Sequence, residues 1–553
     1  MYIKLKNKEL LNYIPIACLM MYFLVILCVY IPNMGGGGLQ LPQNILCWLV
    51  MLLVVFLAGC YVVFVKELKW NLSFVIFIMG SFLLSLPLLW GDSEVQRYAF
   101  LRFAGLWGGL LFYFALLQFS FTFKLKRYLI VTIALSAIIQ AVIASIQVSF
   151  TSPDNIFEFI PGTRPYGIFQ QVNVLASFVA TGYACAVWLL FRSKNWYYCF
   201  LLLVLIAFFS VALDALQSRA GFYGAIIYTL FIFGSGFRPR EKNLTPILFI
   251  VIALSIIITH VLKHSGNEFL QHFGNVDKEG SNTQRWLILK ATLAMIKEHP
   301  LSGWGYGSYE FAAERTALHV FHHMFGSNRS VSHAHNEFLY EWAEGGLLAV
   351  AGMVALISGY FLLLRRSPRN RKAVWGLALP IAFHLMVEYP LYLSVPHWLL
   401  LLIICRIATP ERFYTYHFNH KVSGCFISSI ATIGAIFLLT GFQTGLVLTR
   451  FERQGMVDFT SASRLINPWI EWERWQFDQH TALLVKFNQT HNQKLLRDYA
   501  AWAMKYLEHR NDIRVYQNLV LINKYAPLPA RTVWLKQQWH DYYSALEHFH
   551  NKN

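Results

Sequence analysis

Long apolar runs separated by short polar connections dominate this chain. If runs of about 17–25 apolar residues are taken as membrane-spanning helices, the sequence predicts about thirteen of them. Two intervals break the pattern, a polar stretch at 263–336 and a less apolar region at 450–553. The predicted spans begin near residues 11, 43, 70, 98, 128, 172, 197, 219, 245, 337, 373, 391 and 423.

This pattern predicts an all-α fold, a polytopic membrane helical bundle with two domains. The first domain, 1–449, is transmembrane and includes a large loop at 263–336. The second, 450–553, is a C-terminal helical domain in which a repeat of stacked helix pairs is plausible. Its apolar positions predict four successive short helices, at 469–488, 491–509, 511–525 and 530–549.

Three tryptophans recur at three-residue spacing at the start of the C-terminal domain: Trp469, Trp472 and Trp475. Aromatic residues at helical spacing usually form a packed face, so we expect this stripe to lie in a core. The alternative is a platform on which sugars stack.

The composition agrees with a membrane protein. Of the 553 residues, 56% are apolar and 14% are charged, and the mean hydropathy is +0.45. Soluble domains usually carry about 25% charged residues. The net charge of +17 does not indicate nucleic acid, because the basic residues fall in short clusters between apolar runs and not along one face.

The distribution of basic residues predicts the orientation. Alternate connections, together with the N-terminal lysines, carry 21 lysines and arginines, whereas the opposite short connections carry only Arg97, Arg164 and Arg219. This asymmetry predicts a cytoplasmic N-terminus. Because thirteen is odd, we expect the loop at 263–336 and the C-terminus on the opposite side. No glycine-lysine loop of the Walker type occurs, which argues against ATP as a direct substrate.

Two histidines stand where the polar interval meets the tenth apolar run, in the stretch Ser332-His333-Ala334-His335-Asn336-Glu337-Phe338-Leu339. An imidazole titrates near neutrality and can act as a base, a hydrogen-bond donor or a metal ligand. The alternative is that both residues only cap the helix. With His319, His322 and His323 they form a candidate zinc set, but cysteine ligands are missing, and we expect no metal.

Charged and amide side chains mark the ends of several apolar runs, where they are costly and usually functional. Arg219 opens the eighth run and Arg285 lies in the polar interval, and two guanidiniums at one membrane face would clamp a diphosphate. Alternatively, Arg219 snorkels and Arg285 is solvated. Polar residues also precede and open the sixth run: Arg164-Pro165-Tyr166-Gly167, Gln171 and Asn173. The amides there hold either sugar hydroxyls or a phosphate. Alternatively, they only cap the helix.

Carboxylates occur at the entrance of the tenth run and at the end of the eleventh. Glu337, Glu341 and Glu344 share one helix face, and one of them would orient an imidazole. His384 and Glu388 are four residues apart, so they share a face, and Tyr389 follows. An ion pair that only locks two helices would give the same pattern.

Together these stretches resemble the O-antigen ligase superfamily of bacterial envelope glycosyltransferases. That group combines many spans, one large periplasmic loop and a His-Asn signature that opens the next helix. The matching stretches are 332–339 with Glu344-Gly345-Gly346, Ser218-Arg219-Ala220-Gly221, Arg285-Trp286 and Pro300-Leu301-Ser302-Gly303-Trp304-Gly305.

Three further features resemble the protein O-oligosaccharyltransferase branch of that superfamily, the PglL type. They are Arg164-Pro165-Tyr166-Gly167 with Gln171-Val172-Asn173, the stretch Glu388-Tyr389-Pro390-Leu391, and the appended C-terminal helical domain. Val172 stands where that branch usually has proline.

The resemblance implies a glycosyltransferase in the inner membrane of a Gram-negative bacterium, with the active site and the C-terminus in the periplasm. Such an enzyme moves a preassembled glycan from undecaprenyl diphosphate to serine or threonine hydroxyls of exported proteins such as pilin, without a metal or other cofactor. By analogy, His335 is the catalytic residue, and Arg219 and Arg285 bind the donor diphosphate. Substrate-positioning roles fall to Gln171, Asn173, Arg164, His333, Asn336, Glu388 and Tyr389.

Three alternatives stay open. An O-antigen ligase would use the same donor and transfer the glycan to lipid A core, although the C-terminal domain argues against it. A polymerase would join repeat units on the same carrier. An anion or lipid transporter is the alternative from another class, against which the odd span count and the absence of a detectable internal repeat argue.

Overall fold

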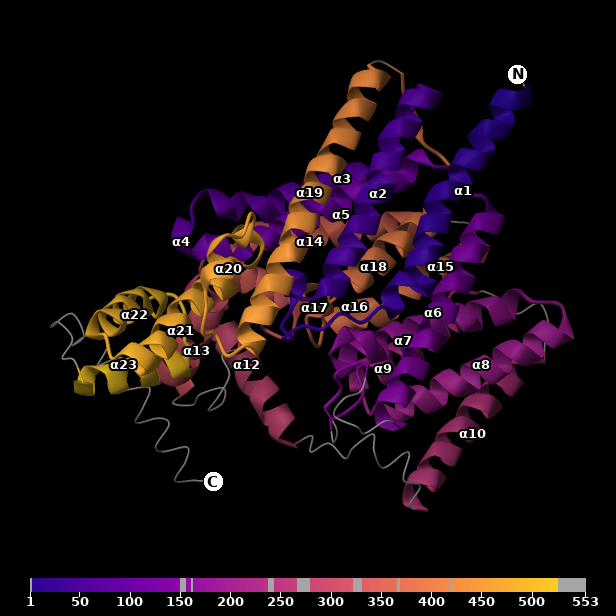
Figure 1. The fold of residues 1–553 in the computed structure, drawn as a ribbon. Helices are drawn as coiled ribbons and strands as arrows, with labels where there is room; N and C mark the ends of the chain where they lie inside the picture. Colours follow the sequence, from indigo (N-terminus) through magenta and orange to yellow (C-terminus); the bar gives the residue numbers. More distant parts are fainter. Residues whose placement is uncertain are drawn as a thin grey trace. The chain divides into compact units, whose positions relative to one another are not determined.

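The computed structural model describes residues 2–149, 156–160, 163–236, 243–265, 279–321, 331–365, 369–417 and 419–525. Within them the chain is almost entirely helical (Figure 1). The exception is a two-stranded antiparallel sheet in which β1 (Leu68–Trp70) pairs with β2 (Tyr414–Tyr416). The predicted all-α class is therefore confirmed.

Ten helical segments of the described residues are long and apolar enough to cross a membrane, so the chain is a multi-pass membrane protein. Three shorter apolar helical segments coincide with the predicted eighth, eleventh and twelfth spans, and the total of thirteen stays a prediction. The ten segments are built on α1 (Tyr2–Leu24), α2 (Pro42–Val65), α3 (Leu72–Ser85), α5 (Phe100–Gln118), α6 (Phe123–Ser149), α7 (Val172–Arg192), α8 (Trp196–Ala215), α10 (Leu244–His264), α14 (Glu337–Arg365) and α19 (His420–Arg453). The shorter ones are built on α9 (Arg219–Gly234), α15 (Arg369–Trp375) with α16 (Leu379–Leu385), and α18 (Val395–Ala408).

The polar interval expected to be a large loop contains two helices, α12 (Glu279–Glu298) and α13 (Tyr309–Phe321). In the C-terminal region, α21 (Trp472–Thr490), α22 (Gln493–Tyr506) and α23 (Ile513–Tyr525) confirm three of the four predicted helices. The fourth, at 530–549, lies outside the described residues.

Shorter elements connect these helices. They are α4 (Ser93–Gln96), α17 (Pro390–Leu393), α20 (Thr460–Ser463), η1 (Ile26–Cys28), η2 (Gly38–Gln40), η3 (Leu86–Leu89), η4 (Arg97–Ala99), η5 (Gly167–Phe169), η6 (Gly376–Ala378) and η7 (Pro468–Glu471).

The chain divides into two compact units, each of which is described here by itself. The first unit comprises 1–78, 106–276 and 356–438, and the second comprises 79–105, 277–355 and 439–553. The predicted domain boundary between residues 449 and 450 stays a prediction.

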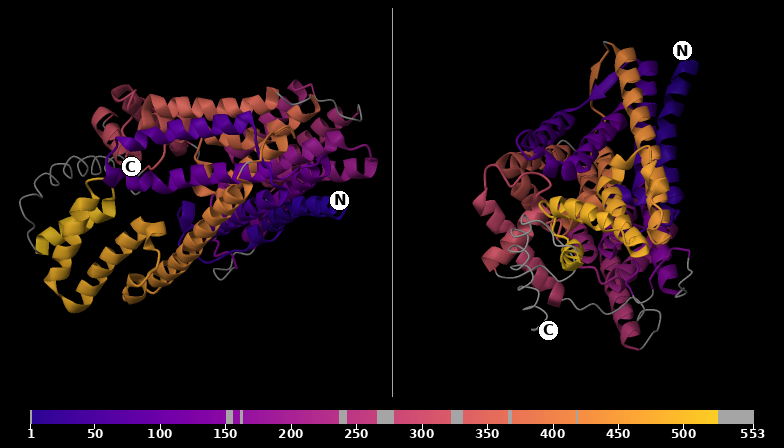
Figure 2. Two further views of the ribbon diagram at one scale, coloured as in Figure 1. Left: turned by 90° about the horizontal axis from the view of Figure 1, so that it is seen from above. Right: turned by 60° about the vertical axis from the view of Figure 1, so that its left-hand side comes forward.

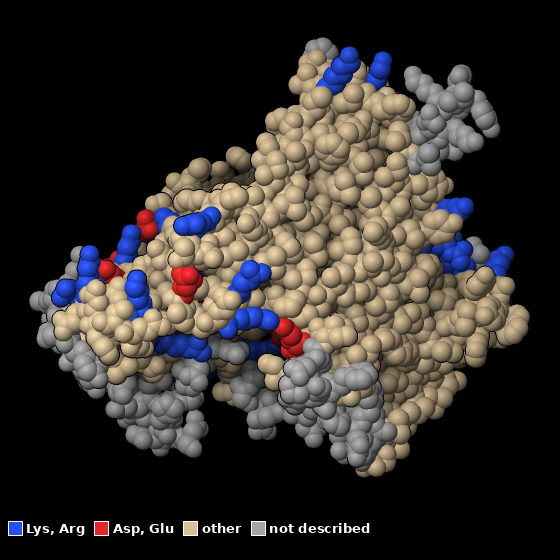
Figure 3. All heavy atoms as spheres, viewed as in Figure 1, with Lys and Arg blue, Asp and Glu red and all other residues tan. Residues whose placement is uncertain are grey.

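Helix α7 is the centre of the first unit. Its apolar window is entirely buried, and α6, α8, α9 and α16 pack against it (Figure 1). Glycines permit the close approach of α9, because a Cβ added at Gly221 would lie 2.6 Å from the Cβ of Ala176. By contrast, α8 and α10 expose large apolar side chains such as Phe200 and Ile250, and their surface in Figure 3 carries no charged residues. A soluble surface rarely exposes so much apolar area, so this face suits lipid.

The C-terminal helices α21 to α23, drawn in yellow in Figure 2, share a small core of their own that includes Leu496, Tyr499 and Val515. The three tryptophans of the stripe are only partly buried. Trp472 and Trp475 are half-buried, whereas Trp469 is exposed, so the expected core position is wrong for Trp469. The reason is that Trp469 lies in η7, before the helix whose periodicity the stripe suggested.

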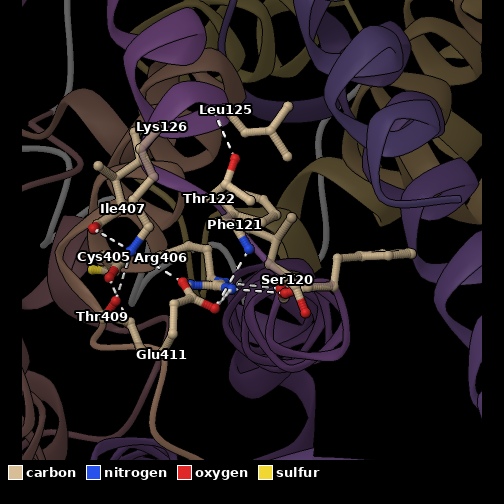
Figure 4. Close-up of polar contacts among 12 residues, drawn as sticks. Ser120, Phe121, Thr122, Leu125, Lys126, Cys405, Arg406, Ile407, Thr409 and Glu411 are labelled. Atoms are coloured by element: carbon tan, nitrogen blue, oxygen red, sulfur yellow. Dashed lines mark hydrogen bonds and ion pairs between the residues drawn. The ribbon is translucent and has the colours of Figure 1, made fainter. Parts of the chain in front are cut away.

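An ion cluster with two buried cations joins the ends of α5, α6 and α18 in the first unit (Figure 4). The guanidinium of Arg406 donates to both carboxylate oxygens of Glu411, at 2.8 and 3.0 Å, and to the carbonyls of Leu116 and Phe119. Lys126 Nζ lies 3.1 Å from Glu411. Burial alone would raise the pKa of Glu411, but the two cations outweigh it and hold this pKa below its usual value. Arg406 and Lys126 are therefore buried partners of Glu411, and not the solvated loop charges that the sequence pattern suggests.

Candidate functional site

The predicted positioning residues at the start of α7 converge on one carboxylate, that of Glu388. Gln171 is the N-cap of α7, since its side-chain carbonyl accepts the backbone N–H of Val174 at 2.6 Å. Its amide nitrogen donates to Glu388 Oε2 at 3.1 Å, and the amide nitrogen of Asn173 donates to Glu388 Oε1 at 2.6 Å. Gln171 thus caps the helix and also binds a second side chain. The alternative role, in which these amides hold sugar hydroxyls or phosphate, stays a prediction.

A chain of hydrogen bonds continues from Glu388 into the core of the first unit. His384 Nε2 lies 3.2 Å from Glu388 Oε2, and its Nδ1 lies 2.8 Å from Ser177 Oγ. The same hydroxyl lies 3.0 Å from His397 Nε2, and His397 Nδ1 lies 2.8 Å from Ser394 Oγ. All five residues are buried. His384 and Glu388, which were predicted to share a helix face, are therefore in contact.

One consistent assignment of donors and acceptors runs through this whole chain. If Glu388 is ionised, His384 donates from Nε2 and accepts the hydroxyl of Ser177 at Nδ1. Ser177 in turn accepts from His397 Nε2, and Ser394 donates to His397 Nδ1. Every polar atom then has a partner, which a buried polar network requires. In this assignment Glu388 accepts from Gln171, Asn173 and His384.

The first turn of α9 is attached to the same cluster. Ser218 donates to Asn173 Oδ1 at 2.7 Å and caps α9 at the N–H of Gly221. Arg219 follows directly and is exposed. Arg164 donates to the carbonyl of Leu216 at 3.3 Å, so it binds the turn that leads into Arg219. The first unit therefore ties the segment that carries Arg219 to Asn173, and Arg164 to the turn before that segment.

Tyr389 follows Glu388 and is the half-buried N-cap residue of α17. The turn from α17 to α18 is held by Asn44, which donates to the carbonyl of Leu393 at 2.9 Å and accepts the N–H of Val395 at 2.9 Å. These two bonds fix the backbone that follows Tyr389. The predicted site residues that the first unit links are Arg164, Gln171, Asn173, Arg219, Glu388 and Tyr389.

In the second unit, the glycine-rich turn after α12 interlocks with a break in α14. Gly346 has a φ of 64° inside α14 and interrupts the helix. The freed backbone groups are used by the turn: the N–H of Gly305 donates to the carbonyl of Glu344 at 2.9 Å, and the N–H of Leu347 donates to that of Leu301 at 3.0 Å. A Cβ at Gly303 would lie 2.2 Å from the oxygen of Glu344, so only glycine fits there.

The carboxylate of Glu344 organises this second site. Its Oε1 accepts the backbone N–H groups of Gly307 and Tyr309 at 2.9 and 3.0 Å, where α13 begins, and its Oε2 lies 2.8 Å from the guanidinium of Arg102. Glu341 lies 3.8 Å from the same guanidinium, which also stacks on Tyr340 and two further aromatic rings. The sequence analysis missed Arg102, although a charge inside the fourth apolar run is itself a signal.

The two motif histidines stand beside this cluster. The ring of His333 lies 4.9 Å from that of Tyr340, and its Nδ1 is 2.9 Å from Ser332 Oγ. Burial and the positive charge of Arg102 lower the pKa of His333, so this imidazole is neutral at pH 7. His335 has a φ of 53°, and strained backbone of this kind is often found at active sites. Asn336 then caps α14 by accepting the N–H of Leu339 at 3.0 Å.

Arg285 lies half-buried in α12, in the same unit as His335, whereas Arg219 belongs to the first unit. The convergence of these three residues on one diphosphate stays a prediction. Of the candidate zinc set, His319 is exposed on α13, and His322 and His323 lie outside the described residues. The expected independence of metal also stays a prediction.

Comparison with protein families identifies three matching stretches. Residues 204–354 match the O-antigen ligase family, residues 372–550 match the C-terminal part of the virulence factor membrane-bound polymerase family, and residues 165–190 match the protein glycosylation ligase family. No curated protein matches the chain. The matched stretches contain all the residues proposed for the site except Arg164.

Replacement of Arg102 should destabilise the fold strongly. Arg102→Ala leaves Glu344 buried without its cation, which we expect to lower the free energy of unfolding by about 3–5 kcal/mol. Arg97→Ala is the matched control, because Arg97 pairs with Glu94 on the surface, where such a pair contributes about 1 kcal/mol or less. Denaturation in detergent micelles measures both. Equal effects would show that the buried pair has no special role.

Glu388→Gln should disturb the start of α7. A glutamine side chain keeps the shape but turns an NH₂ group toward one of the three donors, and we expect a loss of about 1–3 kcal/mol in unfolding free energy. Glu67→Gln, at a half-buried carboxylate of the same unit, serves as the control. Unchanged stability of the Glu388 variant, measured in the same way, would mean that the three donors do not depend on a carboxylate.

Proposed function

Because the chain belongs to the O-antigen ligase superfamily and matches its protein glycosylation branch, we propose that it is a protein O-oligosaccharyltransferase. Its donor would be an oligosaccharide carried on undecaprenyl diphosphate, and its acceptors would be serine and threonine hydroxyls of exported proteins such as pilin. The reaction would occur at the periplasmic face of the inner membrane, with the C-terminus on that side.

The observation that carries this proposal is the geometry of the stretch that matches the glycosylation ligase family. Gln171 and Asn173 lie in that stretch, and both bind Glu388, the residue before Tyr389. Two segments that resemble this branch, more than 200 residues apart in sequence, are therefore one structural feature. Tyr389 and the exposed Arg219 stand at its edge, where a sugar diphosphate would find a cation and hydroxyl and amide groups.

The reaction we propose is a displacement at the anomeric carbon. The acceptor hydroxyl oxygen forms a bond to that carbon, the bond from the carbon to the phosphate oxygen breaks, and undecaprenyl diphosphate leaves. Arg219 and Arg285 would stabilise the charge that develops on the diphosphate. His335 would accept the proton of the hydroxyl from a distance of about 3 Å. No step in this scheme requires a metal.

The rest of the second unit would hold His335 in place for this task. Asn336 fixes the start of α14 directly after it, and His333 is held against Tyr340 two residues before it. The pair of Arg102 and Glu344 fixes the same face of α14. A base whose neighbours are fixed in this way loses little entropy when the acceptor binds.

A second candidate follows from the match of residues 372–550 to the polymerase family. A polymerase would use the same donor and would extend glycans without a protein acceptor. Transfer to lipid A core would instead indicate an O-antigen ligase. Purified protein given the lipid-linked donor with pilin, with lipid A core or with neither acceptor separates the three, because only a polymerase gives a ladder without an acceptor. Movement of donor across vesicles with no covalent product would indicate a transporter.

His335→Ala should abolish glycan transfer while the protein remains inserted and folded. Intact-mass analysis of exported proteins would then lack the added glycan mass that cells with the unaltered chain show. His319→Ala is the matched control, because His319 is an exposed histidine on α13, and we expect it to retain transfer. Glycan addition by the His335 variant at normal abundance would remove His335 from the mechanism.

A further inference from the structure

Helix α19 is longer than a membrane requires. Its 34 residues span about 50 Å, whereas the hydrocarbon core of a bilayer is about 30 Å thick. Between Lys421 and Gln443 the sequence has no charged or amide side chain. The stretch 422–440 would be roughly 28 Å long. If the hydrocarbon core begins directly after Lys421, it ends near Thr440, and the rest of α19 extends beyond it.

After α19 ends, the chain folds back along the helix. Asn467 donates to Thr440 Oγ1 at 3.2 Å and accepts from Thr444 Oγ1 at 2.8 Å. Ile470 packs so closely on Gly441 that a Cβ there would lie 2.1 Å from its Cδ1. Since Thr440 lies thirteen residues before Arg453, the segment 467–470 returns about 20 Å along the helix axis. It thus lies level with the end of the apolar layer.

Two large apolar side chains are exposed at this level. Ile466 is 74% exposed and Trp469 is 63% exposed, whereas their neighbours Asn467 and Ile470 are buried against α19. On α19 itself, Leu439 is also exposed at the same height. The apolar surface of the spanning helix therefore continues onto the segment that returns to it.

The stacked tryptophans hold this patch rigidly. Trp469 stacks on Trp472 with ring centroids 4.8 Å apart and 10° between the planes, and Trp472 stacks on Trp475 at 5.3 Å. The indole N–H of Trp475 donates to the carbonyl of Ala462. Phe459 contacts both Trp475 and Phe451, which lies near the end of α19. The row of rings therefore runs from Trp469 away from the apolar layer.

We propose that Ile466 and Trp469 form a lipid anchor that inserts into the interfacial region of the bilayer. Tryptophan favours the boundary between headgroups and acyl chains, because its ring is apolar and its N–H needs a polar partner. An exposed aliphatic side chain beside it fits acyl chains. An aliphatic side chain such as that of Ile466 does not stack on a sugar. The anchor fixes the start of the C-terminal helices at the membrane surface, whatever the substrate of the enzyme.

Lipid quenching tests this anchor in the full-length protein reconstituted into vesicles. Lipids brominated near the headgroup quench nearby tryptophans, whereas lipids brominated near the chain ends quench deep ones. We expect Trp469→Phe to remove part of the shallow quenching and to leave the deep quenching unchanged. Trp475→Phe is the matched control, since its ring belongs to the same stack but lies near Phe451, and it should leave both signals unchanged.

Two results would overturn the proposal. One is shallow quenching that is the same with and without Trp469. The other is a fluorescence change on titration with a soluble oligosaccharide that disappears in Trp469→Phe, while brominated lipids have no effect on Trp469. As a second variant, Ile466→Asp should raise hydrogen exchange in residues 456–471 in vesicles, whereas Leu521→Asp, at an exposed apolar site on α23, should not. Equal exchange in both variants would also contradict the anchor.

Discussion

A carboxylate buried among apolar helices is stable as an anion only when donors surround it, and each unit of this protein is built around one such group. In the first unit, Glu388 receives hydrogen bonds from Gln171 and Asn173 and is completed by His384. In the second, Glu344 is held by Arg102 and by the backbone at the start of α13. These two carboxylates fix the segments that carry the proposed site residues.

In this arrangement the residues proposed to act on substrate lie next to structural ones. Tyr389 follows Glu388 directly, and Arg219 follows Ser218, which donates to Asn173. In the second unit, His335 lies on the segment that leads into the α14 face held by Glu344. Groups fixed before substrate arrives do not have to reorganise during the reaction, which is where electrostatic stabilisation is most effective.

The sequence predicted features that depend on neighbouring residues and missed those that depend on distant ones. The pairing of His384 with Glu388 follows from local periodicity and was predicted correctly. Most apolar helices also begin within a few residues of their predicted starts. The hydrogen bond between His397 and Ser177 joins two separate helices, so spacing along one helix could not reveal it. Arg102 pairs with residues more than 200 positions away. Trp469 was expected in a core, but the chain reverses after α19, and periodicity does not record such a turn.

In the proposed reaction, Arg219 of the first unit and Arg285 of the second bind the same diphosphate of one donor molecule. A double-mutant cycle measures this directly, using binding of undecaprenyl diphosphate to the full-length chain and to Arg219→Ala, Arg285→Ala and the double variant. Arginines that share a ligand should show a coupling energy of about 0.5–3 kcal/mol. Effects that add within about 0.3–0.5 kcal/mol would contradict a shared diphosphate.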